Sequence, residues 1–103
     1  MKIKFIKQIE ILSSSFKIKW DDSFNGGSFS FTSSEIVIGV QSYKKDPLYT
    51  MSILSHEIME IILVSMGARY DNGRTSNHLF SFDHQQFENA IQLHIQTLNK
   101  FIC

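Results

Sequence analysis

Hydrophobic and polar residues alternate in short runs through the first 40 positions, with polar turns between the runs. Apolar side chains fall at every second position, or nearly so, in residues 2–12, 16–20 and 28–32, and residues 35–40 form a β-branched run. A period of two is typical of β-strands with one buried face. Closely spaced strands separated by polar turns predict an antiparallel sheet of three to four strands.

The second half of the chain carries two helical patterns. Residues 47–66 are largely apolar; they begin with a proline, which suits a first helical turn, and end before Gly67, a good helix-terminating residue. Asp83 and Gln86 have the spacing of a capping box, which predicts a second helix running to about Phe101. The apolar stripe of this helix consists of Phe87, Ile91, Ile95, Leu98 and Ile102.

The order of these elements predicts one α+β domain over residues 1–103, with the sheet packed against both helices. A chain of 103 residues, 43% of them hydrophobic, is long enough to bury a modest core. Residues 68–82 are polar, and we expect a loop there with a short extended piece at 79–82. Arg69 in this loop is expected to be solvated rather than to stabilise an oxyanion.

Charge and cysteine content narrow the expected partners and location. The formal net charge is zero without a basic run, so nothing favours binding to nucleic acid. Cys103 is the single cysteine, which indicates a reducing compartment. Charged residues interrupt the first 12 positions, unlike a signal peptide, and the apolar part of residues 51–66 is short for a membrane span and contains His and Glu. We therefore expect a soluble, cytoplasmic protein with no membrane partner.

Three side chains that can bind metals interrupt the apolar helix: His56, Glu57 and Glu60. Burying them is costly unless they are paired, hydrogen-bonded or bound to a metal. His56 and Glu60 are four residues apart and share one helix face, where they could bind one ion. The alternatives are a core histidine bonded to a neighbour, or a plain solvated face that also includes Ser52 and Ser55.

A metal site on this helix needs a further ligand, since zinc is usually held by three or four protein groups. His84 is the first candidate, because it continues the apolar face of the last helix and is therefore expected to point inward. Glu88, one turn later, is the second candidate. His78 lies in the polar loop and is expected to be solvated, and His94 is expected to be a structural or surface residue.

The segment SHEIME at residues 55–60 resembles the active-site helix of the zincin metallopeptidases, whose motif is His-Glu-x-x-His. The order of a small sheet, a motif helix and a second helix is similar too, over about residues 28–90. The resemblance implies His56 as a zinc ligand and Glu57 as the catalytic base that takes a proton from a metal-bound water. Glu60 stands where the family has its second histidine. A carboxylate can bind zinc, so His56, Glu60 and His84 would form the ligand set; a relative that has lost catalysis could carry the same substitution.

The leading hypothesis is therefore a minimal zinc-dependent hydrolase, a metallopeptidase acting on a peptide or protein. The strand before the motif helix commonly forms the edge that pairs with extended substrate in such enzymes, which implies residues 35–40 as the peptide-binding edge here. Two alternatives remain. One is a zincin-like protein-binding module without turnover, and the other is a small metal-free interaction protein in which His56 pairs with a carboxylate.

Overall fold

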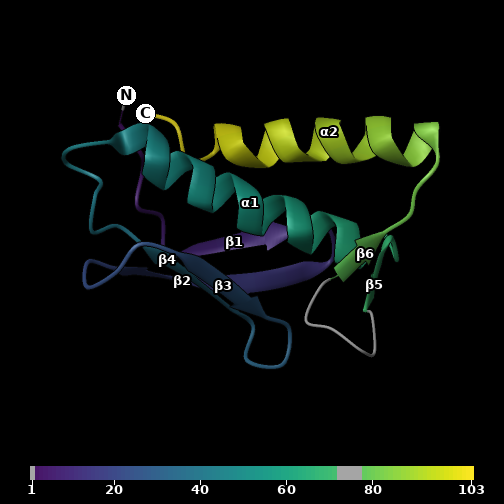
Figure 1. The fold of residues 1–103 in the computed structure, drawn as a ribbon, viewed down its shortest axis with the longest axis horizontal. Coiled ribbons are helices and arrows are strands. Elements are labelled where there is room, and N and C mark those ends of the chain that lie inside the picture. Colours follow the sequence, from purple (N-terminus) through teal and green to yellow (C-terminus); the bar gives the residue numbers. More distant parts are fainter. Residues whose placement is uncertain (1, 72–77) are drawn as a thin grey trace.

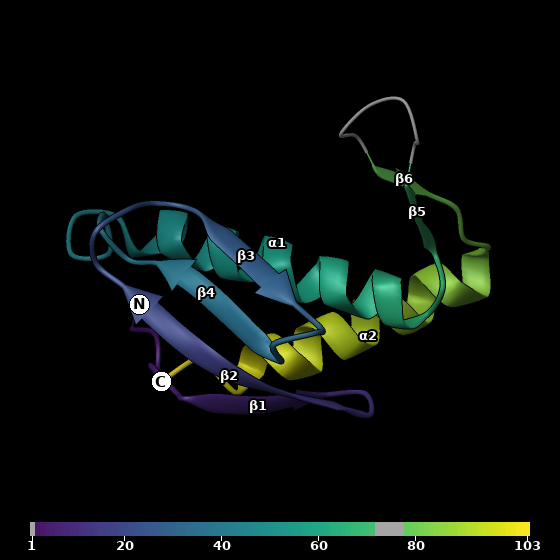
Figure 2. The ribbon, with the colours of Figure 1, turned by 90° about the horizontal axis from the view of Figure 1, so that it is seen from below.

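The computed structural model describes residues 2–71 and 78–103, which form a four-stranded mixed sheet with two helices on one of its faces (Figures 1 and 2). The α+β architecture expected from the sequence is confirmed. The spatial order of the strands is β1-β2-β4-β3. Their bounds are Gln8–Ile11 for β1, Ser14–Asp21 for β2, Gly27–Ser30 for β3 and Glu35–Gly39 for β4.

The two central strands of the sheet run parallel, which the sequence pattern did not predict. β1 pairs with β2 and β3 with β4 in the expected antiparallel sense, whereas Ile18 of β2 lies opposite Ile36 of β4 in a parallel register. The chain therefore passes from β2 to the outer strand β3 and returns between them as β4. The expectation that residues 35–40 form a sheet edge is wrong, because β4 is paired on both sides and β3 is the edge strand next to it.

Helix α1 (Pro47–Ser65) confirms the predicted motif helix. The Asp46 side chain accepts a hydrogen bond from the Tyr49 backbone and caps the N-terminus, with Pro47 in the first turn. Gly67 ends the helix with a φ of 72°, a backbone conformation that glycine adopts without strain. One face of α1 packs on the sheet through side chains that are completely buried: Leu54, Ile58, Ile61 and Ile62.

Helix α2 (His84–Asn99) begins with the predicted capping box, in which Asp83 and Gln86 bond to each other's backbone N–H. The predicted apolar stripe is wrong in phase. Ile95 is 62% exposed, while Ala90 and Thr97 are buried against the rest of the fold. The buried face lies one residue, or about 100°, round the helix from the expected stripe.

The core lies between the sheet and α1 and extends to the chain segments that flank the sheet. Ile3 and Ile102 form an isolated antiparallel bridge, and the Lys4 N–H donates to the Phe101 carbonyl at 2.7 Å. This bridge places the two ends of the chain side by side (Figure 2). The remaining buried apolar residues of the sheet are Ile9, Ile11, Phe16, Ile18, Ile36 and Ile38.

A two-stranded hairpin connects the helices, formed by β5 (Arg69–Asp71) and β6 (His78–Phe80). β6 overlaps the extended piece predicted at residues 79–82, whereas β5 lies in the segment expected to be a loop.

By length and hydropathy alone, α1 could cross a membrane, contrary to the expectation that this stretch is too short: its 19 residues reach a mean hydropathy of 1.3. The central helix of a globular core meets the same criteria. In this fold α1 contacts β3, β4 and α2, and its fully buried isoleucines pack in the core (Figure 1).

Candidate metal centre

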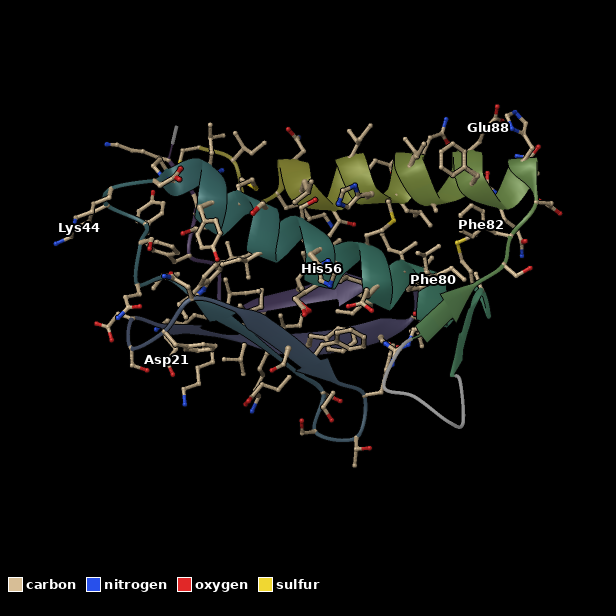
Figure 3. All side chains as sticks on the ribbon, in the orientation of Figure 1. Asp21, Lys44, His56, Phe80, Phe82 and Glu88 are labelled. Carbon is tan, nitrogen blue, oxygen red and sulfur yellow. The ribbon has the colours of Figure 1, made fainter. Side chains whose placement is uncertain are left out.

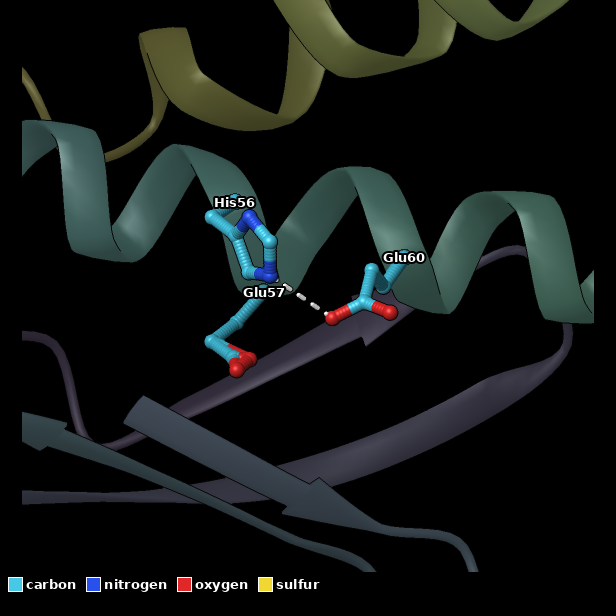
Figure 4. A group of neighbouring side chains, drawn as sticks. All are labelled: His56, Glu57 and Glu60. Carbon is cyan, nitrogen blue, oxygen red and sulfur yellow. Dashed lines mark ion pairs between the residues drawn. The ribbon is translucent and has the colours of Figure 1, made fainter. Parts of the chain in front are cut away.

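His56, Glu57 and Glu60 come together on the middle of α1 (Figure 4). One ligand atom from each of the three side chains lies within 4.8 Å of the other two. The Nε2 atom of His56 is 2.8 Å from Oε2 of Glu60, one helical turn away. The group expected on this helix from the sequence therefore forms a compact cluster of one imidazole and two carboxylates, which could hold a metal ion.

The spacing between His56 and Glu60 is close to what a shared ion requires. Zinc bonds to histidine nitrogen and to carboxylate oxygen are each about 2.0–2.2 Å, so tetrahedral coordination separates two such atoms by about 3.4 Å. The observed 2.8 Å separation of Nε2 and Oε2 would have to widen by about half an ångström. This is within the range of side-chain torsional adjustment, since the His56 side chain is 69% exposed.

Glu57 differs from its two neighbours because it is buried. Only 5% of the residue is exposed, and Oε2 has no hydrogen-bond partner among the described residues. Burial raises the pKa of this carboxyl above its ordinary value, the positive charge available to His56 lowers it, and the negative charge of Glu60 raises it again. A buried carboxylate oxygen without a partner is costly, and a nearby cation or a bound water would offset that cost.

An open pocket of about 510 Å³ adjoins the cluster between α1 and the edge strand. Glu57 is at its wall, and the side chain of Glu57 packs directly against the backbone of Gly27 in β3. A pocket beside a group of titratable side chains is the usual setting of a binding or catalytic site. The lining residues are Gly26, Gly27, Ser52, Ile53, His56 and Glu57.

Arg69 contacts the cluster from β5, although we expected it to be solvated. Its Nη1 atom is 3.7 Å from Oε1 of Glu60, and its guanidinium lies over the ring of Phe29 in β3 at 5.7 Å. The turn at Gly67 and the buried Ala68 direct β5 back toward α1. Gly67 was the only local signal for this reversal, and a glycine does not specify which earlier residue Arg69 contacts.

His84 does not join the cluster. Its side chain is 82% exposed and pairs with Glu88 at 2.9 Å, so the expected inward orientation is wrong. The same rotation of α2 that exposes Ile95 turns His84 outward. Glu88 lies at the N-terminal end of α2, whereas His56 is on the middle of α1 (Figure 3).

The other two histidines have different outcomes. The Nε2 atom of His94 is 2.9 Å from the Ser55 hydroxyl, which links α2 to α1 and confirms a structural role. The side chain of His78 lies outside the described residues, so the expectation that it is solvated stays a prediction.

Comparison with protein-family models, with curated proteins and with solved structures finds no match for this chain. The resemblance to zincins therefore depends on the His56-Glu57 pair, on Glu60 one turn later and on the α+β order of elements.

Proposed function

We propose that this protein is a zinc-dependent hydrolase that acts on peptides. The observation that carries the proposal is the position of Glu57 beside a metal-competent pair and a pocket: this carboxylate is buried, and its Oε2 has no partner within residues 2–71 and 78–103. Such a group lowers the stability of the fold unless something compensates it. Buried, perturbed carboxylates in pockets are frequent at catalytic sites, where their basicity is used.

In this proposal His56 and Glu60 would hold the zinc ion, and Glu57 would be the base that accepts a proton from the attacking water. Bound zinc makes a water molecule acidic enough to lose its proton near neutral pH. A carboxylate oxygen of Glu57 lies within 4.8 Å of the ligand atoms of His56 and Glu60, so Glu57 is beside the place where the ion would be held. Two protein ligands are fewer than most catalytic zinc sites have, so this zinc site is expected to be weaker than those sites.

The exposed edge of β3 supports a peptide as the substrate. The Gly39 N–H donates to the Gly26 carbonyl at 2.7 Å, so the backbone groups of Gly26 face β4. Along an antiparallel strand, residues that bond to the neighbouring strand alternate with residues whose N–H and C=O face away from it. The N–H and C=O groups of Gly27 and Phe29 therefore point away from β4. No described strand pairs with this side of β3, and the pocket adjoins it. An extended peptide could pair there as an additional strand.

Zinc content and hydrolysis in matched variants test the proposal. Wild-type protein supplied with zinc should bind one ion per chain, and His56→Ala should abolish this binding. Glu57→Gln should keep the zinc but fail to cleave a mixed peptide library, because the amide cannot accept the proton. A wild type that stays metal-free would contradict the proposal, and a Glu57→Gln variant that loses zinc would make Glu57 a ligand instead of a base.

A second candidate is a protein-binding module with no turnover. Glu60 in place of a histidine favours it, as does the fact that His56 and Glu60 already satisfy each other without a metal. The same β3 edge would then bind a partner. Under this alternative Glu57→Gln would leave the protein's binding activity unchanged, while substitutions that block the β3 edge, such as Gly27→Pro, would remove it.

A further inference from the structure

Gly27 occupies the point where the edge strand meets the buried carboxylate. A Cβ atom at this position would lie 2.7 Å from Cγ and 3.2 Å from Cδ of Glu57, and 3.0 Å from Cγ2 of Ile53. The first of these distances is shorter than any normal carbon–carbon contact, which is about 3.5–4.0 Å. The Glu57 side chain therefore occupies the space that any other residue at position 27 would need.

This contact fixes one side of Glu57. Its methylene group lies against the β3 backbone, while its carboxylate borders the pocket with one oxygen unpartnered. Glu57 is held by packing because that oxygen makes no hydrogen bond among the described residues. The packing orients the carboxylate without using the lone pairs of Oε2, which remain available for a water or an ion.

The other glycines that the structure describes do not contact Glu57 in this way. A Cβ at Gly26 would meet the ring of Phe24, and one at Gly67 would meet nothing within 4 Å. Glycine within a strand weakens it and often marks a place where another group approaches the backbone closely. At Gly27 the approaching group is the proposed catalytic base.

We infer that Gly27 is a positioning residue for Glu57, resting on the metal-dependent function proposed above: its missing side chain lets β3 lie against Glu57 and keeps the carboxylate at the pocket beside His56 and Glu60, the residues that would hold the ion. Any side chain at position 27 would displace Glu57 while leaving His56 and Glu60 in place. The expected consequence is a metal site that still forms from His56 and Glu60 but is no longer in contact with the Glu57 carboxylate.

Cobalt(II), added alone as a spectroscopic substitute for zinc, tests this inference without a substrate. Its visible absorption depends on the geometry and the ligands of the ion. The Glu57→Ala variant defines the spectrum of a site without Glu57. Gly27→Ala should bind cobalt and give the Glu57→Ala spectrum, whereas the matched control Ser28→Ala, at the next position of the same strand, should give the wild-type spectrum.

The outcomes separate this inference from the proposed function. A wild type that binds no cobalt and no zinc contradicts the proposed function. A Gly27→Ala variant that binds cobalt with the wild-type spectrum overturns the positioning role and leaves the proposed function standing. If Gly27→Ala alone does not fold, the double variant Gly27→Ala with Ile53→Ala removes the Ile53 contact and keeps the clash with Glu57, so that its spectrum gives the same answer.

Discussion

The Nε2 atom of His56 lies 2.8 Å from the Oε2 atom of Glu60, which is a hydrogen-bonding distance, at the place where the proposed site would hold a metal ion. The ion pair is exposed on the His56 side and largely covered on the Glu60 side, where Arg69 also approaches. An incoming ion would displace the proton of this hydrogen bond and keep both side chains close to their present positions. The metal-free cluster is thus nearly preorganised for binding.

Zinc affinity should depend on the His56–Glu60 pair and not on the His84–Glu88 pair. We expect His56→Ala and Glu60→Gln each to weaken zinc binding by about 100-fold or more, since even residues that only orient metal ligands contribute about 10–100-fold. The measurement is isothermal titration calorimetry. His84→Ala is the matched control, because His84 has the same i,i+4 pairing with Glu88 but lies outside the cluster. An equal loss in His84→Ala would restore it as a ligand.

Replacing Glu57 should stabilise the metal-free protein. Methionine keeps the methylene that packs against Gly27 and removes a buried oxygen that has no partner in the described part of the chain. An unsatisfied buried polar group costs about 1–3 kcal/mol, so in the presence of a chelator Glu57→Met should raise Tm at pH 7 by about 4 °C or more. Glu10→Gln removes one surface carboxylate as a control and should leave Tm nearly unchanged. A lower Tm for Glu57→Met would mean that the carboxylate is satisfied in solution.

The stability of the metal-free protein should also fall as the pH rises above about 4.5. Burial raises the pKa of Glu57 from its ordinary value of 4.5, so the folded state holds this proton more tightly than the unfolded state. The resulting stabilisation is fully present below pH 4.5 and is lost as the pH rises through the raised pKa. Urea unfolding of wild type and Glu57→Met across this range should show a difference that grows with pH. A stability difference between wild type and Glu57→Met that stays constant across this pH range would contradict the raised pKa of Glu57.

Gly39 should tolerate no side chain. A Cβ there would overlap the Phe24 carbonyl oxygen and would lie 2.8 Å from the Gly26 backbone nitrogen, both on the loop that leads into β3. Backbone atoms cannot move aside as a flexible side chain can, so Gly39→Ala should cost about 3 kcal/mol or more, at the upper end of the usual penalty for overpacking. Urea unfolding measures this loss. Gly67 is unsuitable as a control position, because its φ of 72° would strain any other residue. Ser28→Ala, on the exposed part of β3, should change stability little.

Much of the fold follows from local patterns because local interactions determine it. Helix α1 was predicted within one residue at its C-terminal end, since Pro47 and Gly67 act on the backbone where they stand. The capping box of α2 was predicted for the same reason. The parallel pairing of β2 with β4 was missed, because side-chain alternation is the same in parallel and antiparallel strands. The consecutive apolar residues Ile36, Val37 and Ile38 did carry a signal for an interior strand.

At the candidate site, too, the sequence predicted the residues that are close together in the chain but not those that the fold brings in from other elements. His56, Glu57 and Glu60 lie within one and a half turns of one helix, so their spacing in sequence was sufficient to bring them together. Gly27 and Arg69 reach the cluster only through the paths of β3 and β5. His84 was misplaced because the orientation of α2 depends on how it packs against α1, and a shift of one residue reverses whether a side chain is buried.

The bridge between Ile3 and Ile102 has a mechanical consequence. Lys4 bonds to Phe101, and Cys103 bonds to Lys2, so the two ends of the chain meet in a short antiparallel pairing (Figure 2). A force that pulls residues 2 and 103 apart would break these hydrogen bonds one after another, starting at the chain ends, and would not load them all at once. The ends should therefore separate under a small load, while the parallel pair β2–β4 and helix α1, with the candidate metal cluster, stay folded.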